Sequence, residues 1–193
     1  MFFDFLEKIV YSHERYYQAA GERKMKLLVF SDSHRANITD MLALIDEEKP
    51  DAVVHLGDLV SDVEDIHFVY PELPVYNVRG NNDWGDDETP NSMVVPVEHV
   101  RLFLTHGHLY GVRRDTKRLV EAARAEGCQV ALYGHTHRAE IHQEDGVLVA
   151  NPGSISRPYT AEPPSYLRLT IHGDVIESEL VYLKNTKKKR LWL

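Results

Sequence analysis

The sequence predicts an α/β fold made of two β-sheets packed as a sandwich, with helices on the outside. Two observations support this fold class. Up to about residue 135, short apolar runs alternate with amphipathic segments, as in parallel strands connected by helices. Beyond that point the period changes, and strand-like runs are separated by tight-turn residues, which predicts hairpins. We see no internal repeat and no linker, so one domain is expected over residues 25–183.

The first βα unit is the clearest. Lys26–Ser31 is almost continuously apolar, as expected for a strand buried in a parallel sheet. A crossover helix is expected over Asn37–Glu48, because Asn37 or Thr39 can cap its start and Pro50 follows its end.

The remaining elements follow from the same patterns. A second helix is expected over Asp115–Glu126, before Gly127. Two hairpins are expected around Asp145-Gly146 and Gly173-Asp174. The strands are expected at Ala52–Leu56, Val75–Val78, Val100–Thr105, Gln129–Tyr133, Glu140–Gln143, Val147–Ala150, Tyr166–Ile171 and Val175–Tyr182.

Both ends of the chain differ from this central region. Residues 1–24 are expected to form a helical extension, because Phe2, Phe5, Leu6, Ile9 and Val10 recur near helical spacing. Such a helix can pack on the domain or on a second subunit of a homo-oligomer. Residues 184–193 are expected to be a solvated basic tail.

Composition excludes several classes of protein. No apolar stretch approaches the 18 residues of a membrane span, and no cationic leader precedes an apolar block, so neither a membrane protein nor a secreted one is expected. Cys128 is the sole cysteine, which excludes an internal disulfide and fits a cytoplasmic location. The net charge of −8 disfavours a stable complex with nucleic acid.

Five polar clusters each follow an apolar run, where the ends of strands place ligands in open α/β sheets. Their side chains offer carboxylate, amide and imidazole groups and no thiolate, which suits Mn, Fe, Zn or Ni. The clusters therefore predict a two-metal site. They are Asp32-Ser33-His34, Gly57-Asp58, Gly80-Asn81-Asn82-Asp83, His106-Gly107-His108 and Gly134-His135-Thr136-His137.

Two cations about 3.5–4 Å apart can hold the attacking and leaving oxygens of a phosphoryl displacement and lower the pKa of a bridging water. Such a site needs a bridging carboxylate, and Asp58 is the candidate. Taken singly, Asp32 or Asp58 could cap a turn or a helix and Asn81 could belong to an ordinary turn, but the complete set favours metal ligands.

Other polar residues have supporting or structural roles in this interpretation. His108 is expected to lie beside a ligand or contact phosphate, and Asp83 to orient a loop or a ligand. His55 alternates with core residues and is expected to be a satisfied buried histidine. Arg113 and Arg114 belong to no motif, although either could border the cleft and pair with a phosphate diester.

The ordered motifs resemble the calcineurin-like metallophosphoesterase superfamily, whose pattern runs D-x-H, G-D, G-N-H-D/E, H and G-H-x-H. The segments Lys26–His34, Thr105–His108 and Asn151-Pro152-Gly153-Ser154 look most like the YfcE-like small phosphodiesterase branch. The resemblance covers roughly Met25 to Leu183. It implies two divalent metal ions, Mn²⁺ foremost, with Ni²⁺, Fe²⁺, Zn²⁺ and Mg²⁺ as alternatives. It implies that Asp32, His34, Asp58 and His137 hold the first metal, and that Asp58, Asn81, His106 and His135 hold the second.

One position departs from the family pattern. The residue after Asn81 is commonly His in the superfamily and often Cys in this branch, but here it is Asn82. An asparagine can donate a hydrogen bond to a phosphoryl oxygen but has no proton to give at neutral pH. A loss of about 10²–10⁴-fold is expected on substrates with poor leaving groups if the position supplies an acid.

The resemblance implies a metal-dependent phosphodiesterase that acts on a small phosphate ester, with Asp58, Asn82 and His108 as the catalytic candidates. A hydroxide bridging the metals would attack phosphorus in line. Two alternatives stay open: a protein-binding scaffold on the same fold, as in the retromer subunit with its degraded site, and a phosphomonoesterase, which would need more positive groups near the cleft than the motifs supply. The sequence leaves the natural substrate undetermined.

Overall fold

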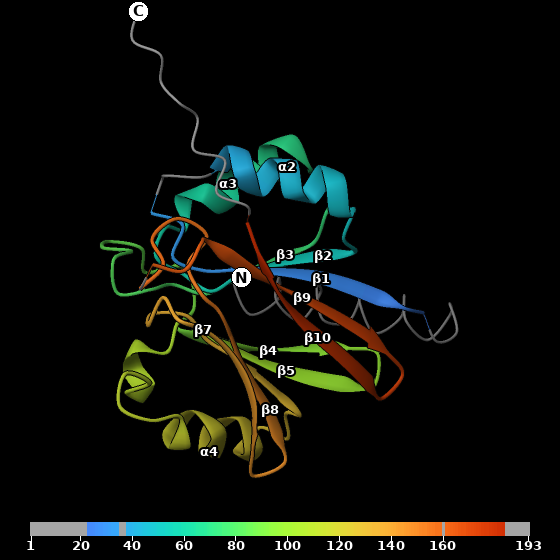
Figure 1. Ribbon diagram of the computed structural model, residues 1–193, viewed down its shortest axis with the longest axis vertical. Helices are drawn as coiled ribbons and strands as arrows, with labels where there is room; N and C mark the ends of the chain where they lie inside the picture. The colour runs from blue at the N-terminus through green and yellow to red at the C-terminus, as the bar shows by residue number, and fades with distance from the viewer. Residues whose placement is uncertain (1–22, 35–37, 160, 184–193) are drawn as a thin grey trace, which may run out of the picture.

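The computed structural model describes residues 23–34, 38–159 and 161–183, and these form two five-stranded sheets packed face to face (Figure 1). This arrangement confirms the expected two-sheet α/β sandwich with flanking helices. The predicted N-terminal helix and basic tail lie outside the described residues. Within the described residues, no helix combines the length and apolar character needed to cross a membrane.

The first sheet has the order β10-β9-β1-β2-β3. Its three N-terminal strands are parallel, whereas β9 and β10 form an antiparallel hairpin on the edge of β1. The hairpin turns at Gly173-Asp174, as predicted. The strands are β1 (Met25–Phe30), β2 (Ala52–His55), β3 (Val75–Asn77), β9 (Ser165–His172) and β10 (Val175–Tyr182).

The second sheet has the order β4-β5-β6-β8-β7. Strands β5, β6 and β8 are parallel, and the edge strands β4 and β7 are antiparallel to their neighbours. The predicted hairpin at Asp145-Gly146 connects β7 to β8. The strands are β4 (Ser92–Val97), β5 (Val100–Thr105), β6 (Val130–Leu132), β7 (Ala139–Glu144) and β8 (Val147–Pro152).

Helices cover the outer face of each sheet (Figure 1). The first sheet carries α2 (Ile38–Glu48) and α3 (Ser61–Val69), and the second carries α4 (Lys117–Ala125). A single 3₁₀ turn, η1 (His108–Tyr110), follows β5. Of the two expected caps of α2, residue 37 lies outside the described residues, and Thr39 lies inside the helix instead of before it.

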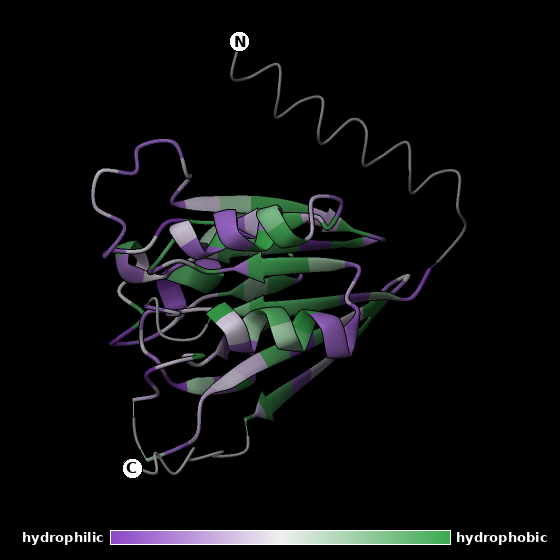
Figure 2. Ribbon diagram, turned by 90° about the horizontal axis from the view of Figure 1, so that it is seen from above, coloured by the Kyte–Doolittle hydropathy of each residue, from purple (hydrophilic) through white to green (hydrophobic). Residues whose placement is uncertain are grey.

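Strand alternation explains why each sheet is covered on both faces. In β1, Leu27 and Val29 face the other sheet, while Leu28 and Phe30 pack under α2 and α3. All four side chains are fully buried, so β1 is apolar along its length. Figure 2 shows hydrophobic strands in the interior and hydrophilic residues in the loops at one end.

Besides the 3₁₀ turn η1, one helix and one strand were not anticipated from the sequence. Helix α3 buries Val63 and Ile66 but exposes Phe68 and Val69, so its apolar residues do not mark one face. Strand β4 contains Pro96, which is tolerated because β4 is an edge strand and needs no hydrogen-bond donor on its open side.

The connectivity brings the polar clusters to one edge. The parallel strands β1, β2 and β3 end at Phe30, His55 and Asn77, and the polar loops follow them within a few residues. Strands β5 and β6 of the other sheet end in the histidine loops. The two sheets therefore deliver their loops to a shared edge of the sandwich.

Candidate metal centre

The loops at this edge have an unusual backbone. Asp32, His34, Asp58, His135 and His137 all have φ between 47° and 66°, the left-handed region that residues other than glycine seldom adopt. Each such conformation costs about 1–3 kcal/mol and persists only where the surroundings enforce it. Its concentration at the predicted ligand positions marks this edge as a functional site.

Two motif glycines are required by close approach of the loops. A Cβ on Gly80 would lie 2.1 Å from Asp58 Oδ1, and a Cβ on Gly134 would lie 1.9 Å from Ser31 Oγ and 2.9 Å from Asp32 Oδ2. The glycines that precede Asn81 and His135 therefore let these loops pack directly against the two buried aspartates.

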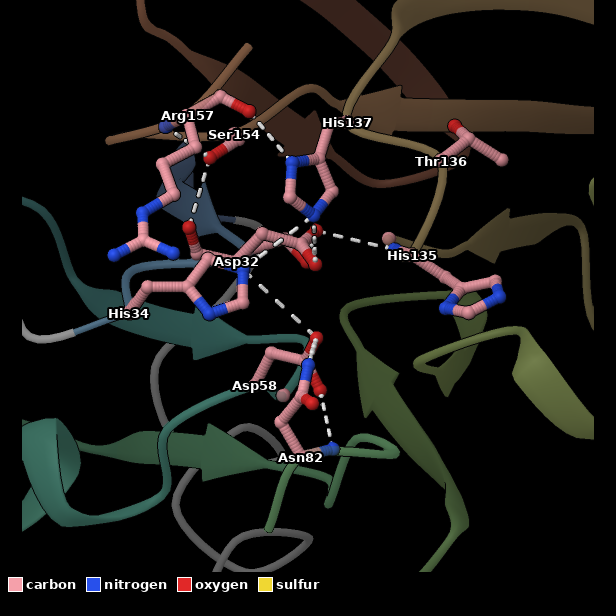
Figure 3. A network of polar contacts seen from close by, with 12 residues as sticks. Asp32, His34, Asp58, Asn82, His135, Thr136, His137, Ser154 and Arg157 are labelled. Carbon is pink, nitrogen blue, oxygen red and sulfur yellow. Dashed lines mark hydrogen bonds and ion pairs between the residues drawn. The ribbon is translucent and has the colours of Figure 1, made fainter. Parts of the chain in front are cut away.

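Asp32, His34, Asp58 and His137 form one group of potential ligands (Figure 3). One ligand atom from each lies within 4.8 Å of the others. His137 Nε2 is 3.1 Å from Asp32 Oδ1 and 3.4 Å from His34 Nε2, while His34 Nε2 is 4.0 Å from Asp58 Oδ2. The side chains of β1, β2 and β6 loops thus converge on one point.

The orientation of His137 fits a metal ligand. Its Nδ1 lies 2.5 Å from the carbonyl oxygen of Arg157, which can only accept, so Nδ1 carries a proton. In its neutral form the ring presents the lone pair of Nε2 to the group, as imidazoles that bind metal do.

A second group lies on the other side of Asp58. His106 Nε2 is 3.4 Å from Asp58 Oδ1 and 3.2 Å from Asn81 Oδ1. His106 is fully buried, and its Nδ1 donates to the carbonyl oxygen of Leu56 at 2.7 Å, which directs Nε2 into the site. The ring of His135 lies 5.1 Å from that of His106, centroid to centroid.

Asp58 therefore stands between the two groups. Its Oδ2 faces His34 and its Oδ1 faces His106. The carboxylate is 2% exposed and also accepts two hydrogen bonds from Asn82, one from the backbone N–H at 2.9 Å and one from Nδ2 at 2.6 Å. The amide that we expected to face a phosphoryl oxygen thus holds Asp58 in this structure.

Asp83 organises the loop that carries Asn81 and Asn82. Its Oδ2 accepts hydrogen bonds from the backbone N–H groups of Asp58 at 3.0 Å and Gly80 at 2.6 Å, and its Oδ1 accepts one from Val60 at 3.0 Å. This agrees with the expectation that Asp83 orients a loop.

The Asn-Pro-Gly-Ser turn supports the site from behind. Ser154 Oγ donates to the carbonyl oxygen of Asp32 at 2.8 Å and accepts from the backbone N–H of Arg157 at 2.7 Å. Asn151 Nδ2 donates to the carbonyl oxygen of Gly134 at 2.9 Å and to Thr136 Oγ1 at 3.0 Å. Ser154 therefore ties the loop of Asp32 to the loop of Arg157.

Burial and neighbouring charges set the protonation of the site. Burial lowers the pKa of His135 to about 4 and also lowers the pKa values of His34 and His108, so these rings are neutral near pH 7. Hydrogen bonding to Asp32 raises the pKa of His137. Burial opposes ionisation of Asp32, but the rings of His137 and His106 outweigh it and lower its pKa.

The donor set fits divalent cations. Asp32 Oδ1 is buried, and the polar group that faces it among the described residues is Nε2 of His137, 3.1 Å away. Carboxylate oxygens, an amide oxygen and imidazole lone pairs that face one another repel unless a cation lies between them. They are the donors expected for Mn, Fe, Zn or Ni.

The remaining sequence expectations can be placed too. His108 lies at the start of η1 with its ring 5.4 Å from that of His106, and its Nδ1 is buried without a hydrogen-bond partner among the described residues. His55 is buried, and both of its ring nitrogens have a hydrogen-bond partner. Nε2 lies 3.0 Å from Ser33 Oγ, and Nδ1 accepts from the backbone N–H of Gly57, which confirms a buried histidine with its hydrogen bonds made.

A pocket of about 760 Å³ opens beside His135 and His137. Its lining includes Arg113 and Arg114, so the loop that carries them does border the cleft. Lys117 and Arg138 also line it, and neither was predicted as a site residue from the sequence. The signal for Arg138 was its position directly after the Gly-His-Thr-His motif.

Comparison with known proteins shows the family to which the chain belongs. Residues 25–174 match the calcineurin-like phosphoesterase superfamily domain. A probable metallophosphoesterase from Methanothermobacter thermautotrophicus is 35% identical over 166 residues, which cover 81% of this chain and 92% of that protein. Phosphodiesterase YfcE from Escherichia coli is 37% identical over 99 residues, 48% of this chain and 50% of that protein.

Solved structures agree. The structure of YfcE, a phosphoesterase from E. coli, superposes with a TM-score of 0.60 at 28% identity and covers 83% of this chain and all of that one. Vacuolar Protein Sorting 29 from Cryptosporidium parvum has a TM-score of 0.71 at 22% identity, over 85% of this chain and 94% of that one, which shows a shared fold. With the matched domain, the relatives and the arrangement of the motifs together, the chain belongs to the calcineurin-like phosphoesterase superfamily, in its small YfcE-like branch.

Proposed function

We propose that this protein is a phosphodiesterase that uses two divalent metal ions, Mn²⁺ foremost. The observation that carries the proposal is the position of Asp58, whose two carboxylate oxygens face two separate groups of potential ligands. Asp32, His34 and His137 complete the first group, and Asn81, His106 and His135 the second. When bound, two divalent ions supply charge stabilisation and a water of lowered pKa.

The chain's own residues have defined tasks in this proposal. Asn82 restrains the Asp58 carboxylate through two hydrogen bonds, and Asp83 holds the loop from which Asn82 projects. His108 lies beside His106 with its Nδ1 unpaired, so it can donate to a phosphoryl oxygen or to the leaving oxygen. Because the lowered pKa of His108 leaves the ring neutral near pH 7, it acts as a hydrogen-bond donor and not as a general acid.

Removal and return of metal tests the proposal directly. Chelator-treated protein is expected to lose hydrolysis of bis(4-nitrophenyl) phosphate and to regain it when Mn²⁺ is added. If Mn²⁺, Mg²⁺, Ni²⁺ and Zn²⁺ all fail to restore turnover, the protein-binding scaffold is the better reading. A larger kcat/KM on 4-nitrophenyl phosphate than on the diester would instead indicate a phosphomonoesterase.

The role of Asp58 is tested by Asp58→Asn. Mutation of a residue that only hydrogen-bonds to a metal ligand already lowers metal affinity or activity by about 10–100-fold. Loss of a bridging ligand is therefore expected to lower kcat/KM at least 100-fold and to reduce bound Mn²⁺ from two equivalents to one or fewer. Asp65→Asn, on the exposed surface of α3, is the matched control. An Asp58→Asn protein that keeps both metals and its rate would disprove the bridging role.

A further inference from the structure

The pocket beside His135 and His137 is rich in cationic side chains. It is lined by four cationic side chains, Arg113, Arg114, Lys117 and Arg138, and by three carboxylates. Its volume of about 760 Å³ lies within the range of small-molecule sites, which is about 300–1,000 Å³. The pocket is thus large enough for a substrate arm that extends beyond the scissile phosphate.

Hydrogen bonds and one ion pair within the lining hold the carboxylates of the pocket in place. Glu140 accepts a hydrogen bond from the hydroxyl of Tyr133, and Glu144 accepts one from the hydroxyl of Thr116 and lies 3.5 Å from His142 Nε2. Asp115 pairs with Arg114 Nε at 3.5 Å and accepts from the backbone N–H of Lys117 at 3.2 Å.

Three of the cations remain without such a partner. Among the described residues, Arg113, Lys117 and Arg138 have no carboxylate oxygen within 4.0 Å. Arg138 is instead held over the ring of Tyr159, with its guanidinium carbon 4.0 Å from the ring centroid. The lining carries four cationic side chains against three carboxylates, and three of those cations are unpaired within the described part of the chain, so the pocket can hold an anion.

Helix α4 starts at the same wall of the pocket. Thr116 occupies the N-cap position but makes no side-chain capping hydrogen bond, because its hydroxyl is directed to Glu144. The helix has nine residues, and the Asp115 carboxylate already accepts a hydrogen bond from its first N–H group, that of Lys117, so the cationic side chains remain the groups available to an anion.

The pocket adjoins the metal centre, because His135 and His137 belong to its lining. Arg138 directly follows His137, and the charge of Arg113 is felt at His135, whose pKa it lowers after burial and His106. An anion held here would therefore be a near neighbour of a phosphate at the centre, in the same molecule.

We propose that this pocket binds a second phosphate group of the substrate, held by Arg113, Lys117 and Arg138. The natural substrate is then a phosphodiester whose other arm ends in a phosphate, such as a nucleotide phosphorylated on both sides of its sugar. This inference rests on the proposed function and goes beyond it by naming the class of substrate.

A matched pair of substrates tests the inference. Thymidine 5′-(4-nitrophenyl phosphate) and the same compound with a 3′-phosphate release the same leaving group and differ by one phosphate. The wild-type protein with Mn²⁺ is expected to show at least a tenfold larger kcat/KM on the 3′-phosphorylated compound. Lys117→Gln and Arg138→Gln are each expected to reduce that ratio several-fold, whereas Arg118→Gln, an exposed neighbour outside the pocket lining, should leave it unchanged.

Binding gives a readout that does not need turnover. Thymidine 3′,5′-bisphosphate is expected to bind the Mn²⁺-loaded protein about tenfold more tightly than thymidine 5′-monophosphate in calorimetry. The difference should disappear in the Lys117→Gln, Arg138→Gln double variant.

The outcomes separate the two proposals. Equal kcat/KM on both substrates, or an equal loss on both in the variants, would overturn the second-phosphate site while the phosphodiesterase stands. No turnover of either compound would refute the proposed function. The comparison of bisphosphate and monophosphate binding would then show by itself whether the pocket holds a second phosphate.

Discussion

Gly80→Ala tests whether the approach of two loops sets the geometry of the centre. The added Cβ would lie 2.1 Å from Asp58 Oδ1 and 2.5 Å from the backbone nitrogen of Asp58. Ordinary contact begins at 3.4 Å, so the carboxylate oxygen must move by about 1.3 Å. The backbone nitrogen cannot yield as a flexible side chain does, so the strain falls on the loop and on Asp58.

The size of the effect follows from that displacement. A misplacement of about 1 Å at a reacting centre can cost about 100-fold in rate, which corresponds to about 2.7 kcal/mol of activation free energy. We therefore expect kcat/KM for bis(4-nitrophenyl) phosphate to fall about 100-fold and the affinity for Mn²⁺ to weaken. Overpacking should also lower the unfolding free energy by about 1–3 kcal/mol.

Rates at saturating Mn²⁺, metal content and thermal melting are the measurements. Gly85→Ala is the matched control in the same loop, because its φ of +82° strains an alanine but nothing lies within 4 Å of the added Cβ. It should lose stability and keep its kcat/KM within about twofold. If Gly80→Ala retains the rate and metal content of Gly85→Ala, close approach does not position Asp58.

Two further predictions follow from buried or substituted groups. Burial lowers the pKa of His55 to about 4. Between pH 6.5 and 4 the unfolded chain therefore binds a proton at this residue and the folded protein does not, so the unfolding free energy decreases as the pH is lowered. From pH 7 to pH 5, urea unfolding of the wild type should lose about 2 kcal/mol more than that of His55→Gln, and an equal loss in both proteins would exclude this origin. Asn82→His restores an ionisable group beside Asp58 and should speed esters with poor leaving groups more than activated aryl esters; a uniform change across a series of leaving groups would show that the position supplies no acid.

Local patterns in the sequence were enough for most of the fold. Apolar runs gave β1, β2, β5 and β6, and turn residues gave both hairpins, because strand pleating and tight turns depend on neighbours within a few residues. Helix α3 and strand β4 were not predicted, because their apolar residues make contacts that exist only once the two sheets have assembled.

The composition of the centre was also readable from the chain. Each presumed ligand follows a strand, and parallel strands end at a common edge, so Asp32, Asp58 and His135 could be expected to meet. The need for glycine at positions 80 and 134 became clear only from the distances between loops.

By itself, then, the sequence determined which side chains gather at the edge of the sandwich and what chemistry they offer. Tertiary structure alone decided that the Asn82 amide holds Asp58 and that Arg113, Lys117 and Arg138 face one pocket. The physical reason is the separation along the chain: the backbone N–H of His135 donates to Asp32 across 103 residues, and charges brought together over such distances leave no periodic signal in the sequence.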